Sequence, residues 1–239
     1  MFVLVSALGT AAMLLTHLAP FPFLLETFHR GDSAWHMPAS SHVVYLTYDD
    51  GPNPTATPQI LDVLQRENVR ATFFLIDDHV TAETASIVRR MFEEGHSVGL
   101  HSNDRWLMAG SPASITSALD QAAGRIETLA GSRPCPWFRP HAGWRSAGMY
   151  EALDNLGYRL AGWTWGMWDW NWGRERERAA LGERLARRAD AGDVIVIHDG
   201  HHVEPRADRQ YAIEATGALI PALRARQLEI APLPCRPTD

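Results

Sequence analysis

Residues 47–53 read Thr47-Tyr48-Asp49-Asp50-Gly51-Pro52-Asn53 and give the strongest indication of fold and chemistry in the chain. They follow Val43-Val44-Tyr45-Leu46, an apolar and β-branched run that predicts a buried strand. Successive side chains of a strand point to opposite faces, so Asp49 and Asp50 can do different work, one as a base and one as a cation ligand. Gly51-Pro52 then turns the chain and leaves both carboxylates at the end of the strand. The alternative is an ordinary Asp-Asp-Gly-Pro surface turn, and the later strands argue against it.

Six more apolar runs follow the first, and segments with helical periodicity separate them. The predicted strands span residues 43–48, 71–76, 97–100, 135–138, 158–163, 193–197 and 227–231. A helix is expected after the first strand, with Thr57 as its N-cap and Pro58 at its first position. Five more helices are expected at 81–94, 112–130, 147–156, 174–190 and 209–226. This alternation predicts an α/β protein with a parallel sheet, open or closed into a barrel.

Length and charge narrow the class of protein. The 239 residues, 46% of them hydrophobic, suit one large domain. The formal charge of −6 and the absence of a Lys/Arg-rich run argue against a nucleic-acid partner. Cys135 and Cys235 are too few for a disulfide framework or a cysteine zinc site. They can pair with each other in an oxidising compartment, which the sequence alone does not decide.

The first 25 residues contain no Asp, Glu, Lys or Arg and are long enough to cross a bilayer. We therefore expect a membrane anchor or uncleaved signal at 1–25, a linker at 26–42 and the functional domain at 43–235. This domain is expected outside the cytoplasm, at the cell envelope or on the periplasmic side. The alternative is an apolar N-terminal helix that packs on the domain.

Polar side chains that suit catalysis or metal binding follow most of the predicted strands. They are Asp49, Asp50, His101, Arg139, Asp169 and His198. In parallel α/β barrels the reactive residues gather at the carboxyl ends of the strands, so we expect these side chains to converge. A neutral His101 beside Asp50 suits a divalent metal, with zinc as the expected ion.

The other polar residues suit the proton transfers of a hydrolysis. The Arg139 guanidinium can hold Asp49 and keep it ionised as a general base, and Asp169 can in turn position Arg139. His198 can give a proton to a leaving amine, because imidazole titrates near neutrality.

Five of the nine tryptophans of the chain fall between Trp163 and Trp172. Core packing can use one or two of them, whereas five in one loop predict a wall that stacks on sugar rings. We expect Trp168 and Trp170 to contact a substrate.

Together these residues resemble the polysaccharide deacetylase family, the enzymes that share the NodB homology domain. The resemblance covers roughly residues 42–231 and five motifs: Thr47–Pro52, His101-Ser102, Phe138–Pro140 with Gly143, Asp169-Trp170 and Val194–Asp199. It implies a distorted (β/α) barrel with seven parallel strands. It also implies that Asp49 is the catalytic base, that Asp50 and His101 bind the metal, and that the Ala142 backbone N–H stabilises an oxyanion.

The chain departs from the family pattern at three places. Arg105 stands where the second motif ends in a histidine, so one of three protein metal ligands is missing. Gly166 replaces the first aspartate of the fourth motif, and His141-Ala142 replaces a Pro-Tyr pair in the third. Asp104 is the expected third ligand, after a small loop shift. In the alternative, the Arg105 guanidinium replaces the cation and polarises the substrate carbonyl itself.

The resemblance implies a hydrolase that cleaves a non-peptide carbon–nitrogen bond. Its expected substrate and partner is an N-acetylated glycan, from which it removes an acetyl or similar acyl group. The alternative is a membrane-anchored glycan-binding protein that has lost catalysis, in which Arg105 marks the lost metal. The retention of Asp49, Asp50, Arg139 and His198 favours the enzyme, because a binding protein does not need an acid–base set.

Overall fold

The computed structural model describes residues 33–38, 42–166 and 175–235, and in the last range it describes side chains from residue 180 onward. The expected anchor at 1–25 lies outside these ranges, and so do Trp168, Asp169 and Trp170. Among the described residues, no helix is both long enough and apolar enough to span a bilayer.

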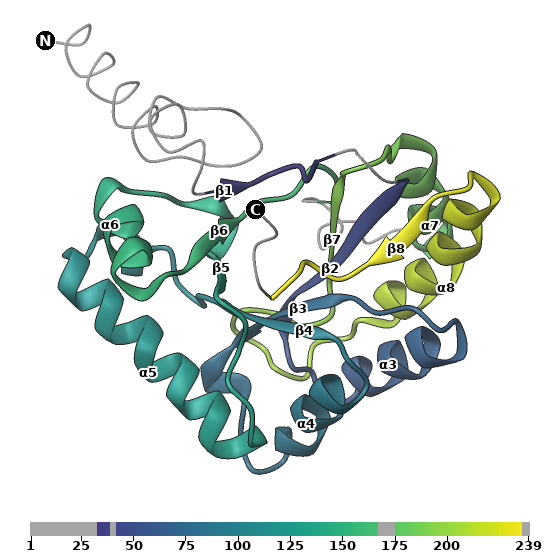
Figure 1. Ribbon diagram of the computed structural model, residues 1–239. Coiled ribbons are helices and arrows are strands. Elements are labelled where there is room, and N and C mark those ends of the chain that lie inside the picture. Colours follow the sequence, from purple (N-terminus) through teal and green to yellow (C-terminus); the bar gives the residue numbers. More distant parts are fainter. Residues whose placement is uncertain (1–32, 39–41, 167–174, 236–239) are drawn as a thin grey trace, which may run out of the picture.

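The core of the fold is one curled sheet of parallel strands (Figure 1). Its strands are β1 (Ser33–Ala34), β2 (Val43–Gly51), β3 (Thr72–Ile76), β4 (Ser97–His101), β5 (Trp137–Arg139), β6 (Arg159–Ala161), β7 (Val194–His198) and β8 (Glu229–Ala231). The strand order is β1-β6-β5-β4-β3-β2-β7, and β8 pairs with the beginning of β2. Two isolated bridges, His36 with Asp193 and Trp165 with Ile195, join the ends of this order. The sheet therefore closes into a distorted (β/α) barrel, as predicted.

All seven predicted strands are present, and β1 is an addition that the sequence did not reveal. β1 pairs with Leu160 and Ala161 of β6, although it lies in the predicted linker at 26–42. A strand of two residues carries no periodicity, so a pattern search cannot find it. Strands β3 and β7 are apolar on both faces because helices cover the outside of the barrel and side chains fill the inside.

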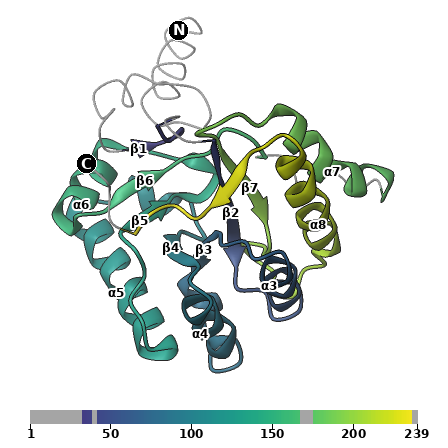
Figure 2. The same cartoon turned by 45° about the vertical axis from the view of Figure 1, so that its right-hand side comes forward.

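Helices surround the strands, with α5 and α6 on one side and α7 and α8 on the other (Figures 1 and 2). They are α3 (Ala56–Arg66), α4 (Ala85–Glu93), α5 (Pro112–Ala130), α6 (Ala147–Leu156), α7 (Glu175–Arg188) and α8 (Gln210–Ala225). The prediction that Thr57 is an N-cap was wrong. The Asn53 side chain accepts hydrogen bonds from the N–H groups of Thr55 and Ala56 instead, so the helix starts earlier. This leaves the Thr57 hydroxyl free to donate to Asp199.

The C-terminal segment crosses the amino ends of three central strands. Its Leu233 and Pro234 backbone groups form hydrogen bonds with the first residues of these strands, Thr72 of β3, Ser97 of β4 and Trp137 of β5. A disulfide between Cys135 and Cys235 fixes the same segment. The sequence left this pairing open, and the structure shows the two cysteines bonded at the end of the barrel opposite the carboxyl ends of the strands.

Candidate active site

A β-bulge separates the two adjacent aspartates at the end of β2. Asp49 is opposite Phe74 of β3 and Gly51 is opposite Leu75, so Asp50 is the extra residue. Its backbone is left-handed, with φ of 69°, and the bulge directs its side chain away from that of Asp49. Gly200 lies so close that a Cβ there would be 1.9 Å from the Asp50 carbonyl oxygen, which explains the glycine. Strand alternation predicted that the two carboxylates point in different directions. They do so in the structure, and the β-bulge is the structural cause.

Asp49 forms a buried ion pair with Arg139. The Nη1 atom of Arg139 lies 2.6 Å from Oδ1 of Asp49, and the two side chains are 0% and 5% exposed. The guanidinium also donates to the Thr47 hydroxyl and to the carbonyl oxygens of Ala161 and Gly162, and it lies 4.0 Å from the Phe74 ring centre. Burial lowers the pKa of Arg139, and the charge of Asp49 opposes this shift. The predicted pairing is present, and the carbonyl oxygens at the end of β6 fix the guanidinium.

Asp50 and His101 meet in an arrangement that suits a cation. Nδ1 of His101 lies 2.7 Å from the Arg139 carbonyl oxygen, which can only accept, so this nitrogen carries the proton. Nε2 then presents a lone pair to Oδ1 of Asp50, 3.2 Å away. That buried carboxylate oxygen accepts no hydrogen bond from any described residue. Two electron-rich atoms that face each other without a shared proton fit a cation between them.

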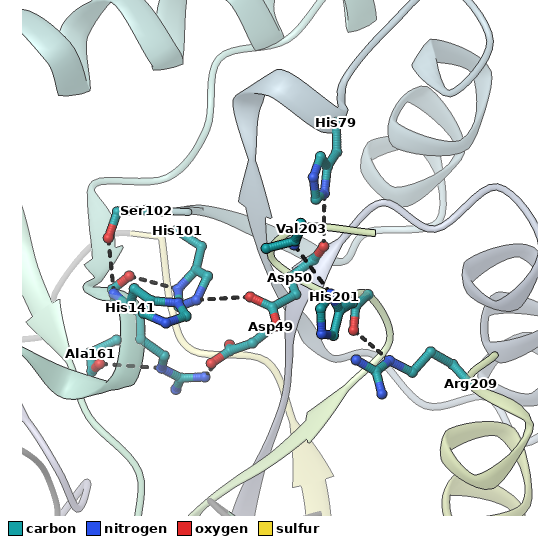
Figure 3. Close-up of polar contacts among 12 residues, drawn as sticks. Asp49, Asp50, His79, His101, Ser102, His141, Ala161, His201, Val203 and Arg209 are labelled. Atoms are coloured by element: carbon teal, nitrogen blue, oxygen red, sulfur yellow. Dashed lines mark hydrogen bonds and ion pairs between the residues drawn. The ribbon is translucent and has the colours of Figure 1, made fainter. Parts of the chain in front are cut away.

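His141 completes this group. Potential ligand atoms of Asp50, His101 and His141 all lie within 4.8 Å of one another. Among the described residues, this is the one cluster of three or more side chains that could hold a metal ion. Burial, assisted by the neighbouring His101, lowers the pKa of His141 to about 4, so the ring is neutral at pH 7. Figure 3 shows His101 and His141 next to each other beside Asp50. A carboxylate and two neutral imidazoles are a common zinc donor set.

The acidity of Asp50 reflects the same surroundings. Burial alone would raise its pKa, but His101, His198 and His141, in their protonated forms, lower the pKa below the usual range. Asp50 is therefore a carboxylate, as a metal ligand must be.

The structure does not bring Asp104, the expected third ligand, into this group. Asp104 is exposed, and its Oδ1 accepts the Trp106 N–H at 2.9 Å. Arg105 also points elsewhere: its exposed guanidinium lies 5.6 Å from the Trp106 ring centre and 5.8 Å from that of Trp144. It forms no ion pair with Asp50, so the alternative in which Arg105 replaces the cation finds no support in the geometry.

His198 lies beside the Asp49 carboxylate, at the strand end where it was predicted. It is opposite Asp49 on the adjacent parallel strands β2 and β7, and it is half-buried. Asp199, the next residue, is fully buried, accepts the Thr57 hydroxyl and faces the Gly51 backbone. Burial raises the pKa of Asp199 to about 7, and the charges of Asp50 and Asp49 add to the effect.

The remaining predicted residues fall into two groups. Ala142 is exposed next to His141, with a left-handed backbone (φ of 53°) that a short side chain tolerates. Trp168, Asp169 and Trp170 lie outside the described residues, so their expected contacts with substrate and with Arg139 remain predictions. Trp163 and Trp165 of the same segment serve the fold, because Trp163 is buried and the Trp165 indole donates to Asp193.

The sequence contains an indication that His141 belongs to the site, which the prediction did not include. His141 follows Phe138-Arg139-Pro140 at the end of β5, and a strand-end position is what selected His101 and His198. The family motif has proline at this position, so the resemblance assigned no metal-binding role to it. His202, in the loop after β7, lies close to His141, with 4.6 Å between the two ring centres.

Comparison with known proteins gives three kinds of similarity. The sequence profile for the family described as "Polysaccharide deacetylase" matches residues 36–161. A chitooligosaccharide deacetylase from a Bradyrhizobium species is 33% identical over 201 residues, which are 80% of this chain and 89% of the relative. A peptidoglycan-N-acetylglucosamine deacetylase from Bacillus cereus is 27% identical over 194 residues, which are 81% and 87%.

Solved structures agree with the sequence matches. The crystal structure of the Bc1960 peptidoglycan N-acetylglucosamine deacetylase superimposes with a TM-score of 0.75 at 26% identity and covers 88% of this chain and 94% of its own. The BA3943 protein of Bacillus anthracis, a CE4 family pseudoenzyme, gives a TM-score of 0.72 at 20% identity, with 84% and 67% covered. At that identity the second likeness concerns the fold alone.

Proposed function

Since the chain belongs to the polysaccharide deacetylase family, we propose that it is a metal-dependent hydrolase that removes an acetyl or similar acyl group from an N-acylated amino sugar in a glycan. The observation that carries this proposal is the position of the buried Asp49–Arg139 ion pair directly beside the group of Asp50, His101 and His141. A base and a metal site are the two parts that hydrolysis of an amide needs.

The proposed metal ligands are Asp50, His101 and His141, and the donor set fits zinc. A divalent cation held there supplies Lewis acidity, which polarises a carbonyl group and makes a water molecule more acidic. Histidine at position 141 takes over the part that the family gives to a histidine at position 105. The loss of one ligand in the second motif is thus balanced by a gain in the third.

The proton transfers fall to two residues on neighbouring strands. Asp49 accepts a proton from the attacking water, and Arg139 orients this carboxylate through the 2.6 Å ion pair. His198 donates a proton to the amine nitrogen as the carbon–nitrogen bond breaks, so the products are a carboxylate and a free amino sugar. The Ala142 backbone N–H is the proposed donor to the oxyanion, a role that does not depend on the side chain.

The protein is proposed to work in an oxidising compartment at the cell envelope. Two observations support this place: the uncharged stretch at 1–25 and the Cys135–Cys235 disulfide. Measurement of the protein in membrane, periplasmic and cytoplasmic fractions tests this, and recovery of reduced protein in the cytoplasm contradicts it.

The activity is tested by acetate release from N-acetylglucosamine oligomers and from a chromogenic acetamide, with zinc, cobalt or nickel added to the metal-free protein. We expect release that depends on the metal. Asp49→Asn should lower kcat by about 10²–10⁴ while metal content is unchanged. The absence of acetate release with any of these metals, together with tight glycan binding by both proteins, would instead identify a glycan-binding protein without catalysis.

A further inference from the structure

A patch of one arginine and two tryptophans lies on the loops that carry the proposed metal ligands. We call it the Arg105 platform, and it consists of Arg105, Trp106 and Trp144. The Arg105 guanidinium lies within cation–π distance of both indole rings, at 5.6 Å and 5.8 Å from their centres. Nothing in the mechanism proposed above uses these side chains.

The platform is joined to the metal site through the backbone. Arg105 is four residues beyond His101, and Trp144 is three residues beyond His141. The Ser102 hydroxyl accepts the His141 N–H at 2.9 Å, and the Trp144 N–H donates to the His141 carbonyl at 3.2 Å. These hydrogen bonds hold the two loops together next to the proposed metal ligands, and the platform residues follow those ligands along each loop.

Trp106 is held outward by an ordered loop. Its side chain is 68% exposed, and among the described residues only Trp106 and Val203 are large hydrophobic side chains with such exposure. The Asp104 carboxylate accepts the Trp106 N–H, and Met108 in the same short 3-10 helix is buried, so the loop is anchored on both sides of the indole. The exposed face of this indole is open to a partner, and the flat C–H face of a pyranose ring is a suitable one.

Arg105 adds a charge that no described carboxylate neutralises. The described ion pairs include none with Arg105, although the whole chain carries a net charge of −6. A guanidinium stacked on aromatic rings keeps its N–H edge free for bidentate contact with a carboxylate or phosphate.

We infer that the Arg105 platform is a glycan subsite that binds an anionic sugar next to the sugar that is deacylated. Trp106 stacks on the sugar ring, and Arg105 pairs with a carboxylate or phosphate substituent on it. The inference rests on the proposed function and narrows its substrate class from N-acylated glycans in general to those in which the neighbouring residue carries a negative charge.

Binding is measured by calorimetry on Asp49→Asn protein, so that no turnover is needed. Three oligomers of equal length are compared: neutral N-acetylglucosamine, one with alternating lactyl-ether carboxylates, and one with a phosphate on alternate sugars. Arg105→Gln should weaken binding of one or both anionic oligomers about tenfold and that of the neutral oligomer less than about twofold. Trp106→Ala should weaken binding of all three by about tenfold. The oligomer with the larger loss identifies the natural substituent.

The control is Arg187→Gln, which removes an arginine with 65% side-chain exposure from α7, on the other side of the barrel from α6 (Figure 1). It should change none of the three affinities. Equal weakening of neutral and anionic oligomers by Arg105→Gln, or no weakening at all, overturns the subsite. A failure of the proposed function is seen separately, because the protein with Asp49 intact would then release no acetate while the pattern of binding is unchanged.

Discussion

The Arg139 guanidinium and the Asp49 carboxylate are 2.6 Å apart, and neither side chain is more than 5% exposed. Two charges removed from water at this depth are tolerated because each neutralises the other and because the guanidinium also donates to Thr47 and to two carbonyl oxygens. The pair comes from β5 and β2, which are separated in the sheet by β3 and β4. It thus links opposite parts of the barrel and orients the proposed base at the same time.

Breaking this pair from the arginine side should be more damaging than breaking it from the aspartate side. Arg139→Met leaves a buried carboxylate and two carbonyl oxygens without donors, and we expect the free energy of unfolding to fall by about 3–5 kcal/mol. Asp49→Asn keeps an oxygen that can accept from Arg139 but leaves the buried guanidinium without its counter-charge, so its stability should fall by less than that of Arg139→Met, with activity lost. Urea denaturation of the two variants checks this. Unchanged stability of Arg139→Met would mean that the pair does not organise the fold.

Asp199 makes stability depend on pH in a direction unusual for an aspartate. Its pKa is raised to about 7 by burial, above the value of about 3.9 in an unfolded chain. Between about pH 4 and pH 7 the native state keeps a proton that the unfolded state has lost. The free energy of unfolding therefore falls as the pH rises through this window, by up to about 1.4 kcal/mol per pH unit.

Asp199→Asn removes this dependence and still offers an oxygen to the Thr57 hydroxyl. The stability of the variant relative to the original protein should rise from pH 4 to pH 7 and then level off. Denaturant titrations at four pH values from 4 to 8.5 measure the difference. A difference that is constant over this range would show that Asp199 is ionised in the folded protein.

The disulfide should affect stability and leave the site intact. Cys135 and Cys235 are 100 residues apart, and removal of a bond that closes a loop of this length costs about 2–5 kcal/mol. The bond lies by the amino ends of β3, β4 and β5, whereas the site lies by the carboxyl ends. The Cys135→Ser/Cys235→Ser variant should unfold at lower temperature with unchanged kcat for the folded fraction. A loss of kcat at a temperature where the variant is fully folded would contradict this.

The barrel could be predicted from the sequence because most of its strands are apolar runs that hydrophobicity patterns identify. β3 and β7 are unbroken apolar runs, and polar residues follow them at the predicted end. Asp49, Asp50, His101, Arg139 and His198 come together as predicted, since parallel strands place their carboxyl ends at one edge. Pairing of Cys135 with Cys235 depends on distance in space, which spacing along the chain does not contain.

The sequence favoured Asp104 over His141 as the third ligand for a related reason. Asp104 is adjacent in sequence to the residue that the family uses, but its backbone directs it to the Trp106 N–H. His141 is 40 residues from His101 along the chain and reaches the same place because β5 pairs with β4. Contacts across strands decide which side chains share a site, and single positions in a motif do not.

If His141 has taken over the ligand position from residue 105, the exchange should be reversible. His141→Ala should lose metal affinity, and Arg105→His in that background should recover part of it by restoring the histidine of the family pattern. In the presence of His141, Arg105→His should change metal affinity by less than about threefold, because the third ligand is already in place. Calorimetric zinc titrations of the four proteins give this cycle. A failure of Arg105→His to recover any affinity would mean that the loop after β4 no longer reaches the site.

The most direct test of the account is the zinc affinity of the original protein, of His141→Ala and of Asp104→Asn, measured on metal-free protein with circular dichroism as a check of folding. We predict one zinc ion per chain for the original protein and the same affinity for Asp104→Asn. For His141→Ala we predict an affinity at least about 100-fold weaker. The account is contradicted if the original protein binds no zinc, or if Asp104→Asn loses the ion while His141→Ala retains it.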